Sequence, residues 1–294
     1  MIPTVLAVVG AGVASFVVLA ALFVPLERAF PARAAQRILR TGFSLDACFF
    51  VGQYLVFGAV ALSVIASIGA VVGDAVPPAL RAWTATRPAW AQVIGALALG
   101  DFAVYWFHRA CHRFEWLWRF HEVHHSAEHL DWLAAHREHP LDGLVTQLCM
   151  NLPAIALGVR LELLAGVAIF RGAWAIFVHS NTRIPLGPLR WLLGAPELHH
   201  WHHARMQTHD ARTVHNFANL APWLDVAFGT YHCPDLRSGE RGERGERGEE
   251  ERYALGLSSE AQASRAGYLG HLVGPLLPRR LLARARQRPY FARS

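Results

Sequence analysis

The chain has 294 residues, of which 53% are hydrophobic and 17% charged, and its mean hydropathy is +0.22. This composition is rare in soluble enzymes of this length and indicates a multi-pass integral membrane protein. All 28 basic residues are arginine, which excludes a lysine Schiff base or a lysine-dependent phosphate loop, and the net charge of +6 comes from arginines that flank apolar segments. We interpret them as topology signals and lipid contacts, with no nucleic acid as partner. The four cysteines are scattered without a CxxC motif and predict neither disulfides nor a thiolate metal site.

The first hundred residues predict three transmembrane helices. Val5 to Leu26 is an apolar run of about 33 Å as a helix, enough to cross a bilayer. Four arginines follow within fourteen residues and put that end in the cytoplasm by the positive-inside rule; they are Arg28, Arg33, Arg37 and Arg40. A second run, Leu45 to Val72, returns to the outer face, where the loop from Gly73 to Pro88 stays. A third, Trp90 to Phe107, delivers His108 to the cytoplasmic surface.

The segment from residue 141 to 178 is too long for one crossing, so we expect a helical hairpin that returns to the side it left. This topology places every histidine cluster on the cytoplasmic face. We divide the chain into N-terminal transmembrane helices (1–100), a histidine-rich catalytic region (101–235), a disordered Gly-Glu-Arg repeat (236–252) and an Arg-rich C-terminal tail (253–294).

Histidines are concentrated in the catalytic region, where three sets have metal-binding spacing. The sets are His108 and His112; His121, His124 and His125; and His199, His202 and His203. Spacings of i, i+3 and i+4 put imidazoles on one face of a helix, within reach of one ion. Eight histidines exceed the need of one metal, so the count predicts two ions, of a kind that imidazole alone does not specify.

Further residues are candidates from position alone. His179 and His139 are additional plausible ligands, which brings the count to ten. A neutral imidazole ligand needs an acceptor for its second ring nitrogen, and acidic residues lie beside the clusters. The acidic candidates are Asp101, Glu122, Glu128, Asp131, Glu138, Glu197 and Asp210.

Several motifs, in order from Asp101 to Tyr231, resemble the fatty acid hydroxylase and sterol desaturase superfamily of membrane oxygenases. They are HRACHRFEWLWRFHEVHHS, REHPLD, HSNTRIPLGPLRWLL, ELHHWHH, HNFAN and WLDVAFGTY. The resemblance implies an all-α transmembrane bundle with a cytoplasmic, histidine-lined cap that holds two iron ions. It implies O2 as co-substrate, a lipid from the bilayer as substrate, and hydroxylation or desaturation of an unactivated C–H bond.

The resemblance also assigns roles to individual residues. It carries the metal role to His108, His112, His121, His124, His125, His139, His179, His199, His202 and His203. Asn216 opens the run Asn-Phe-Ala where the family usually has Asn-Tyr-Gly. Because the chain has no haem, flavin or ferredoxin motif, we expect electrons from a separate donor protein.

Two other functions fit part of the pattern. The sequence HEVHH satisfies HExxH, so His121 and His125 are candidate zinc ligands of a membrane protease, with Glu122 as base and Asp142 as third ligand. That reading leaves the other two sets without a role. A metal transporter would need polar groups inside the spans, whereas these histidines gather at helix ends.

Overall fold

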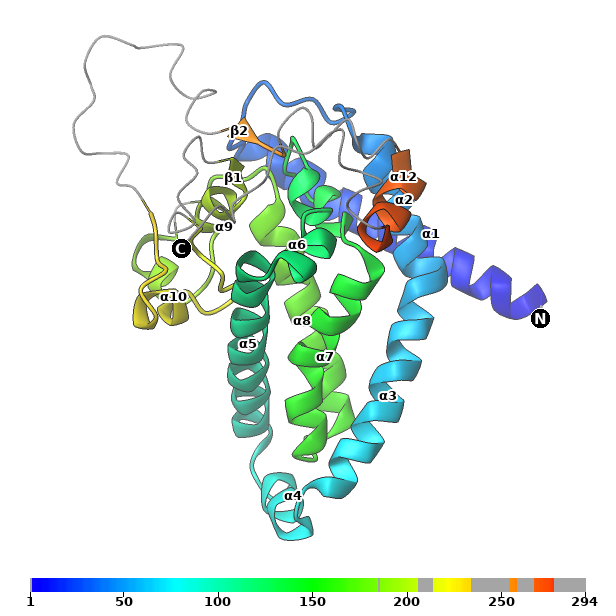
Figure 1. Cartoon of the computed structure of the whole chain (residues 1–294), viewed down its shortest axis with the longest axis vertical. Helices are drawn as coiled ribbons and strands as arrows, with labels where there is room; N and C mark the ends of the chain where they lie inside the picture. The colour runs from blue at the N-terminus through cyan, green and yellow to red at the C-terminus, as the bar shows by residue number, and fades with distance from the viewer. Residues whose placement is uncertain (1, 185, 206–213, 234–253, 258–266, 278–294) are drawn as a thin grey trace.

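The chain forms a helical bundle with a compact cap at one end, as Figure 1 shows. The computed structural model describes residues 2–184, 186–205, 214–233, 254–257 and 267–277. Within them the only strands, β1 (Ala204–Arg205) and β2 (Ala254–Leu255), form one short antiparallel pair. The all-α prediction is therefore confirmed. The Gly-Glu-Arg repeat and the arginines after residue 278 lie outside the described residues.

The bundle is built from long apolar helices. They are α1 (Ile2–Ala29), α2 (Phe43–Gly52), which continues through a π-helix (Gln53–Phe57) into α3 (Gly58–Ala75), α5 (Ala89–Arg113), α7 (Pro140–Ala156) and α8 (Leu161–His179). Four spans are long and apolar enough to cross a bilayer: Leu6–Ala29, Phe43–Ala75, Ala89–Arg113 and Leu161–His179. The predicted apolar runs are thus helices of an integral membrane protein.

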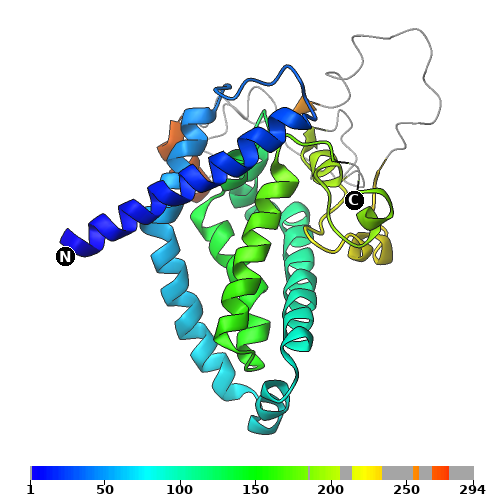
Figure 2. The same cartoon turned by 180° about the vertical axis from the view of Figure 1, so that it is seen from behind.

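One loop of the bundle differs from the expectation. The loop from Gly73 to Pro88 contains a helix, α4 (Pro78–Ala85), because a proline at its first position is pre-set for a helical start. The N-terminal helix does not stand parallel to the others. In Figures 1 and 2, α1 runs obliquely across the bundle near the cap, while α3, α5, α7 and α8 follow the long axis.

Short elements form the cap. They are α6 (Glu115–His121), the 3-10 helices His124–Ser126, Ala134–His136, Gly187–Trp191 and Gly274–Leu276, α9 (Pro196–His202), α10 (Trp223–Ala227) and α12 (Gly267–Val273). The helix α12 packs on α2, where Tyr268 makes an edge contact with Phe49 at 4.9 Å between ring centroids. This part of the expected tail therefore belongs to the cap.

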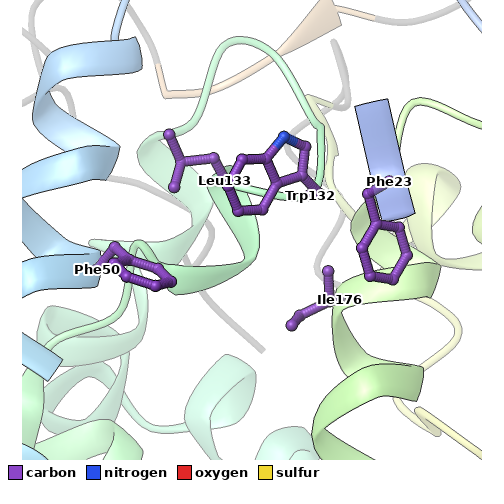
Figure 3. Packing of buried hydrophobic residues seen from close by; sticks show 5 residues of the cluster. All are labelled: Phe23, Phe50, Trp132, Leu133 and Ile176. Carbon is purple, nitrogen blue, oxygen red and sulfur yellow. The ribbon is translucent and has the colours of Figure 1, made fainter. Parts of the chain in front are cut away.

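An apolar cluster fastens the cap to the bundle. Figure 3 shows Phe23 of α1, Phe50 of α2, Trp132 and Leu133 of the cap and Ile176 of α8 converging, and all five are buried. Burying a large apolar side chain contributes about 1.5–3 kcal/mol, so this cluster stabilises the junction on which the histidines depend.

A buried ionic network lies beside that cluster. Arg40 pairs with Asp131 at 2.6 Å and with Asp46 at 2.7 Å, and Arg137 pairs with Asp46 at 2.5 Å. Gly42 has φ 84°, and a side chain there would meet the Arg137 guanidinium at 2.6 Å, so both the backbone and the space require glycine. Arg40, which the sequence indicated as a topology signal, is therefore a structural ion-pair partner.

Candidate metal centre

Five histidines form a first group at the junction of bundle and cap. His108 and His112 project from the last turns of α5, His121 ends α6, His125 lies in the following 3-10 helix, and His202 ends α9. One ring nitrogen from each lies within 4.8 Å of the others. Three chain segments thus converge on one small volume.

Four histidines form a second group next to the first. They are His124, His179 at the end of α8, His199 on α9 and His203, the residue that follows α9. The two groups touch, because the rings of His125 and His203 stack with centroids 4.4 Å apart. The structure therefore brings together nine of the ten predicted ligands in two adjacent sets.

The prediction that each HxxHH set shares one helical face is wrong. The helix α6 ends at His121, and the chain turns before the 3-10 helix begins at His124. His124 and His125 consequently belong to different groups. His202 and His203, at the end of α9, also divide between the two groups. The turn makes one short motif serve both groups.

Backbone carbonyls fix the orientation of four rings. Each of these rings donates from Nδ1 to one carbonyl. The pairs are His108 with Phe217 (2.7 Å), His124 with Arg137 (3.1 Å), His179 with Ala175 (2.6 Å) and His202 with His215 (2.7 Å). A carbonyl only accepts, so Nδ1 of each ring carries the proton. In a neutral ring the other nitrogen, Nε2, is then a bare acceptor.

Those bare nitrogens face one another. The Nε2 atoms of His124 and His179 are 2.9 Å apart, and each ring has already committed its proton elsewhere. Two lone pairs at this distance repel, so the contact needs a cation between or beside them. Protonation is a poor remedy, because burial lowers the pKa of His124 well below its usual value.

Further Nε2 atoms converge in both groups. The Nε2 atoms of His199 and His179 are 2.8 Å apart, and those of His202 and His125 are 3.2 Å apart. Burial also lowers the pKa of His202, to about 3, which keeps the ring neutral. The Nε2 atoms of His108, His112 and His121 are buried without a hydrogen-bond partner among the described residues. Buried neutral imidazoles with unused Nε2 acceptors fit metal ions.

One histidine has a carboxylate partner. His121 Nδ1 contacts Asp142 Oδ2 at 2.8 Å, and both side chains are buried. A carboxylate on the far side of an imidazole fixes the ring and raises its basicity toward a metal. Asp142 therefore has the geometry of an orienting residue for His121.

Other predicted residues lie away from the two groups. His139 accepts from the Leu141 amide through Nδ1 and contacts the Leu272 carbonyl through Nε2, so backbone groups use both nitrogens and the structure does not bring it to the metal centre. Asp131 pairs with Arg40 instead of a histidine, and Asp101 lies 3.6 Å from Arg171 on α8.

Three more of the predicted residues have other positions. Glu122 is buried in the turn after α6, and Glu197 lies half-buried in the first turn of α9; neither belongs to a histidine group. Asn216 adopts φ 58° and ties the cap together, donating to the carbonyls of Leu198 and His232. Asparagine tolerates this left-handed conformation, which explains the residue at this turn.

A cavity of about 660 Å³ leads from the histidines into the bundle. Its walls come from α1, the π-helix, α5, α7 and α8, and His121, His124, His179 and His199 line its inner end. Val18 and Ile169 line it and yet are 63% and 75% exposed, so its mouth lies between α1 and α8 on the apolar side of the bundle. Its volume and largely apolar walls suit a lipid chain.

Comparison with known proteins identifies the region that carries the histidines. Residues 93–230 match the fatty acid hydroxylase family. This region belongs to that family. The resemblance seen in the motifs is confirmed, and both histidine groups lie within the matched residues.

Curated relatives each match about half of the chain. The ornithine lipid hydroxylase OlsE of Rhizobium tropici is 31% identical over 52% of this chain and 45% of its own length. Human alkylglycerol monooxygenase is 30% identical over 45% of this chain and 28% of its own. A very-long-chain aldehyde decarbonylase of rice, GL1-11, is 29% identical over 47% and 52%. The chain thus spans about half or less of these relatives, and no solved structure matches it.

Sequence reasoning missed the partners of the histidines. Four of these partners are backbone carbonyls, which cannot be recognised from residue type because every residue has one. They belong to Phe217, Arg137, Ala175 and His215. Asp142 was considered only as a zinc ligand, although its place in REHPLD at the start of α7 was a usable signal.

Proposed function

We propose that this protein is an oxidoreductase that uses two iron ions and O2 to oxidise an unactivated C–H bond of a lipid. The observation that carries the proposal is the pair of histidine groups, with Nε2 atoms 2.8–3.2 Å apart, beside a largely apolar cavity. Membership of residues 93–230 in the fatty acid hydroxylase family supports it.

The nine histidines would hold the metals: five in the first group and four in the second. Bound iron would supply the activation of O2, which no acid or base side chain can replace on an alkane chain. Carbonyl and carboxylate groups hold the Nδ1 atoms of the neutral imidazoles by hydrogen bonds. These contacts keep the Nε2 donor atoms in place before metal binds.

The cavity would position the substrate. A lipid enters through the mouth near Val18 and Ile169 without leaving the bilayer, and its chain lies against the apolar walls. The reacting carbon then lies beside His121, His124, His179 and His199. A bound lipid chain would displace water from the cavity, and the oxidation would then be directed to the lipid.

The cellular arrangement is part of the proposal. The arginines after α1 favour a cytoplasmic position for the histidine cap. Insertion of one oxygen atom from O2 consumes two electrons and two protons and releases water, and we assign the electrons to a separate donor protein. The names of the relatives, a lipid hydroxylase and an alkylglycerol monooxygenase, support hydroxylation of a polar lipid over desaturation.

The direct test is an O2-consumption and product assay. Purified protein loaded with iron is supplied with a chemical reductant and extracted membrane lipids under 18O2, and lipids that gain one labelled oxygen atom are sought by mass spectrometry. We expect a labelled alcohol from the wild type and none from His202→Ala. Glu122→Gln is the matched control, because Glu122 belongs to neither histidine group. Loss of labelling in Glu122→Gln at full metal content would contradict the proposal and favour the HExxH reading.

A further inference from the structure

A lobe of the cap exposes large apolar side chains beside α5. We define the interfacial lobe as residues 186–194 and 220–228, two segments joined by a hydrogen bond of 2.8 Å from the Gly194 amide to the Leu220 carbonyl. Leu192, Leu189 and Val226 are 59%, 54% and 50% exposed, and Trp191 and Trp223 are 47% and 45% exposed. Several large apolar side chains exposed on two neighbouring segments indicate a binding surface.

Contacts with α5 set the depth of the lobe relative to the bilayer. The Phe228 ring lies 4.9 Å from Trp106 and 6.4 Å from Phe102, both exposed residues of a membrane-spanning helix. Phe102 and Trp106 are about 16 Å and 10 Å below the end of α5, given the rise per helical residue. The helix is about 38 Å long against a hydrocarbon core of about 30 Å, so at most about 8 Å projects at this end.

Phe228 is therefore at the level of the acyl chains. Because the lobe continues the lipid-facing surface of α5, the same bilayer that covers Phe102 and Trp106 reaches the lobe. Figure 1 shows α10 beside the cap end of α5, outside the bundle.

The charges on the lobe and on the adjoining part of α5 suit a phospholipid surface. The Arg190 guanidinium lies 5.6 Å from the centre of the Trp191 ring, and Arg109 lies 5.4 Å from that of Trp106. Tryptophan at the headgroup level with arginine reaching the phosphates is the usual composition of a membrane interface. The carboxylate of the lobe, Asp225, is buried and turned inward.

That carboxylate connects the lobe to the metal centre. Asp225 accepts from the amides of Phe217 (2.8 Å) and Ala218 (3.0 Å), and the Phe217 carbonyl orients His108. The position of the lobe is thus linked to the orientation of His108, a histidine of the first group, through two hydrogen bonds.

We propose that the interfacial lobe is inserted into the leaflet on the histidine side, with Leu189, Trp191, Leu192 and Trp223 among the lipids and Arg190 at the phosphates. The lobe is a monotopic anchor in addition to the spanning helices. The assignment does not depend on the reaction that the protein catalyses.

The test measures the depth of fluorescent labels in the full chain, reconstituted in phosphatidylcholine and phosphatidylglycerol nanodiscs. The four native cysteines are replaced by alanine, and single cysteines are introduced by Leu189→Cys and Trp223→Cys. Leu62→Cys, 69% exposed on the spanning helix α3, serves as the lipid-facing control, and Glu128→Cys, exposed on the cap, as the water-facing control. Each label is quenched by nitroxide lipids or by iodide.

We expect both lobe labels to be quenched by the nitroxide lipids, as at Leu62, and to lose the iodide quenching seen at Glu128. Iodide quenching of both lobe labels equal to that at Glu128 would overturn the proposal. Protection from both quenchers with a doubled protein mass per disc would also overturn it, because a second copy would then cover the lobe.

Discussion

Two buried polar clusters lie side by side in this protein, and they are satisfied in opposite ways. In the network of Arg40, Asp46, Asp131 and Arg137, every charge has an opposite partner within 2.7 Å. In the histidine groups, protons point outward to carbonyls and a carboxylate, and unprotonated nitrogens point inward at each other.

The difference separates a structural cluster from a functional one. A network of two arginines and two aspartates is neutral and complete, so nothing else needs to bind there. Converging lone pairs are incomplete without a cation. One cluster is therefore able to bind metal ions and the other holds the surrounding cap together, and each can be changed separately.

The largest expected effect is on the ionic network. Asp46→Ala leaves two buried guanidinium groups short of a partner, which typically costs about 3–5 kcal/mol, so we expect loss of the folded protein. Thermal unfolding in detergent measures it. Asp74→Ala, at an exposed carboxylate at the end of α3, should change stability by less than about 0.5 kcal/mol. Equal unfolding midpoints for the two variants would show that the network is not structural.

Asp142→Asn tests the carboxylate behind His121. The fold should persist, because the side chains are nearly equal in size, while metal affinity falls by about tenfold to a hundredfold as His121 loses its orienting carboxylate. Metal release to a graded series of chelators measures this. An unchanged affinity would mean that the contact is only a packing contact.

Acid should destabilise the metal-free protein through its buried histidines. Burial lowers the pKa of His136, outside both groups, to about 4 from 6.5, so the unfolded chain binds more protons as pH falls below 6.5 and stability is lost in that direction. Between pH 7 and 5 this residue accounts for about 2 kcal/mol. In His136→Phe, the loss of stability between pH 7 and 5 should therefore be smaller by about 2 kcal/mol. The unfolding midpoint measured as a function of pH reports this change.

Glu138 acts in the opposite direction, since burial raises its pKa to about 8 and its contribution is lost as pH rises through that value. Glu138→Gln therefore serves as the control. If the pH dependence of the unfolding midpoint is the same in His136→Phe and in the wild type, the lowered pKa of His136 is contradicted.

The smallest effect is expected at His139. Its nitrogens serve the Leu141 amide and the Leu272 carbonyl, so His139→Ala should cost about 1 kcal/mol as a lost helix cap and leave the metal content unchanged. His179→Ala, which removes a member of the second group, should lose metal. If His139→Ala and His179→Ala lose the same amount of metal, His139 is a metal ligand and this prediction is contradicted.

Local patterns in the sequence predicted the helices and the composition of the site, but not its division. Apolar runs gave α1, α2 with α3, α5 and α8 because length and hydropathy are properties of a segment alone. The split of His124 from His125 could not be predicted, because it depends on where α6 ends. The roles of Asp131 and Asp142 depend on partners 91 and 21 residues away, which no local spacing encodes.

We propose that the nine converging histidines hold two iron ions. Elemental analysis with Mössbauer spectroscopy on detergent-purified protein from iron-rich medium measures this. We expect close to two irons per chain, with the signal of a coupled pair, and loss of iron on His202→Ala or His124→Ala. A single zinc per chain that is lost on changing His121 or His125, but kept in His202→Ala, would contradict it.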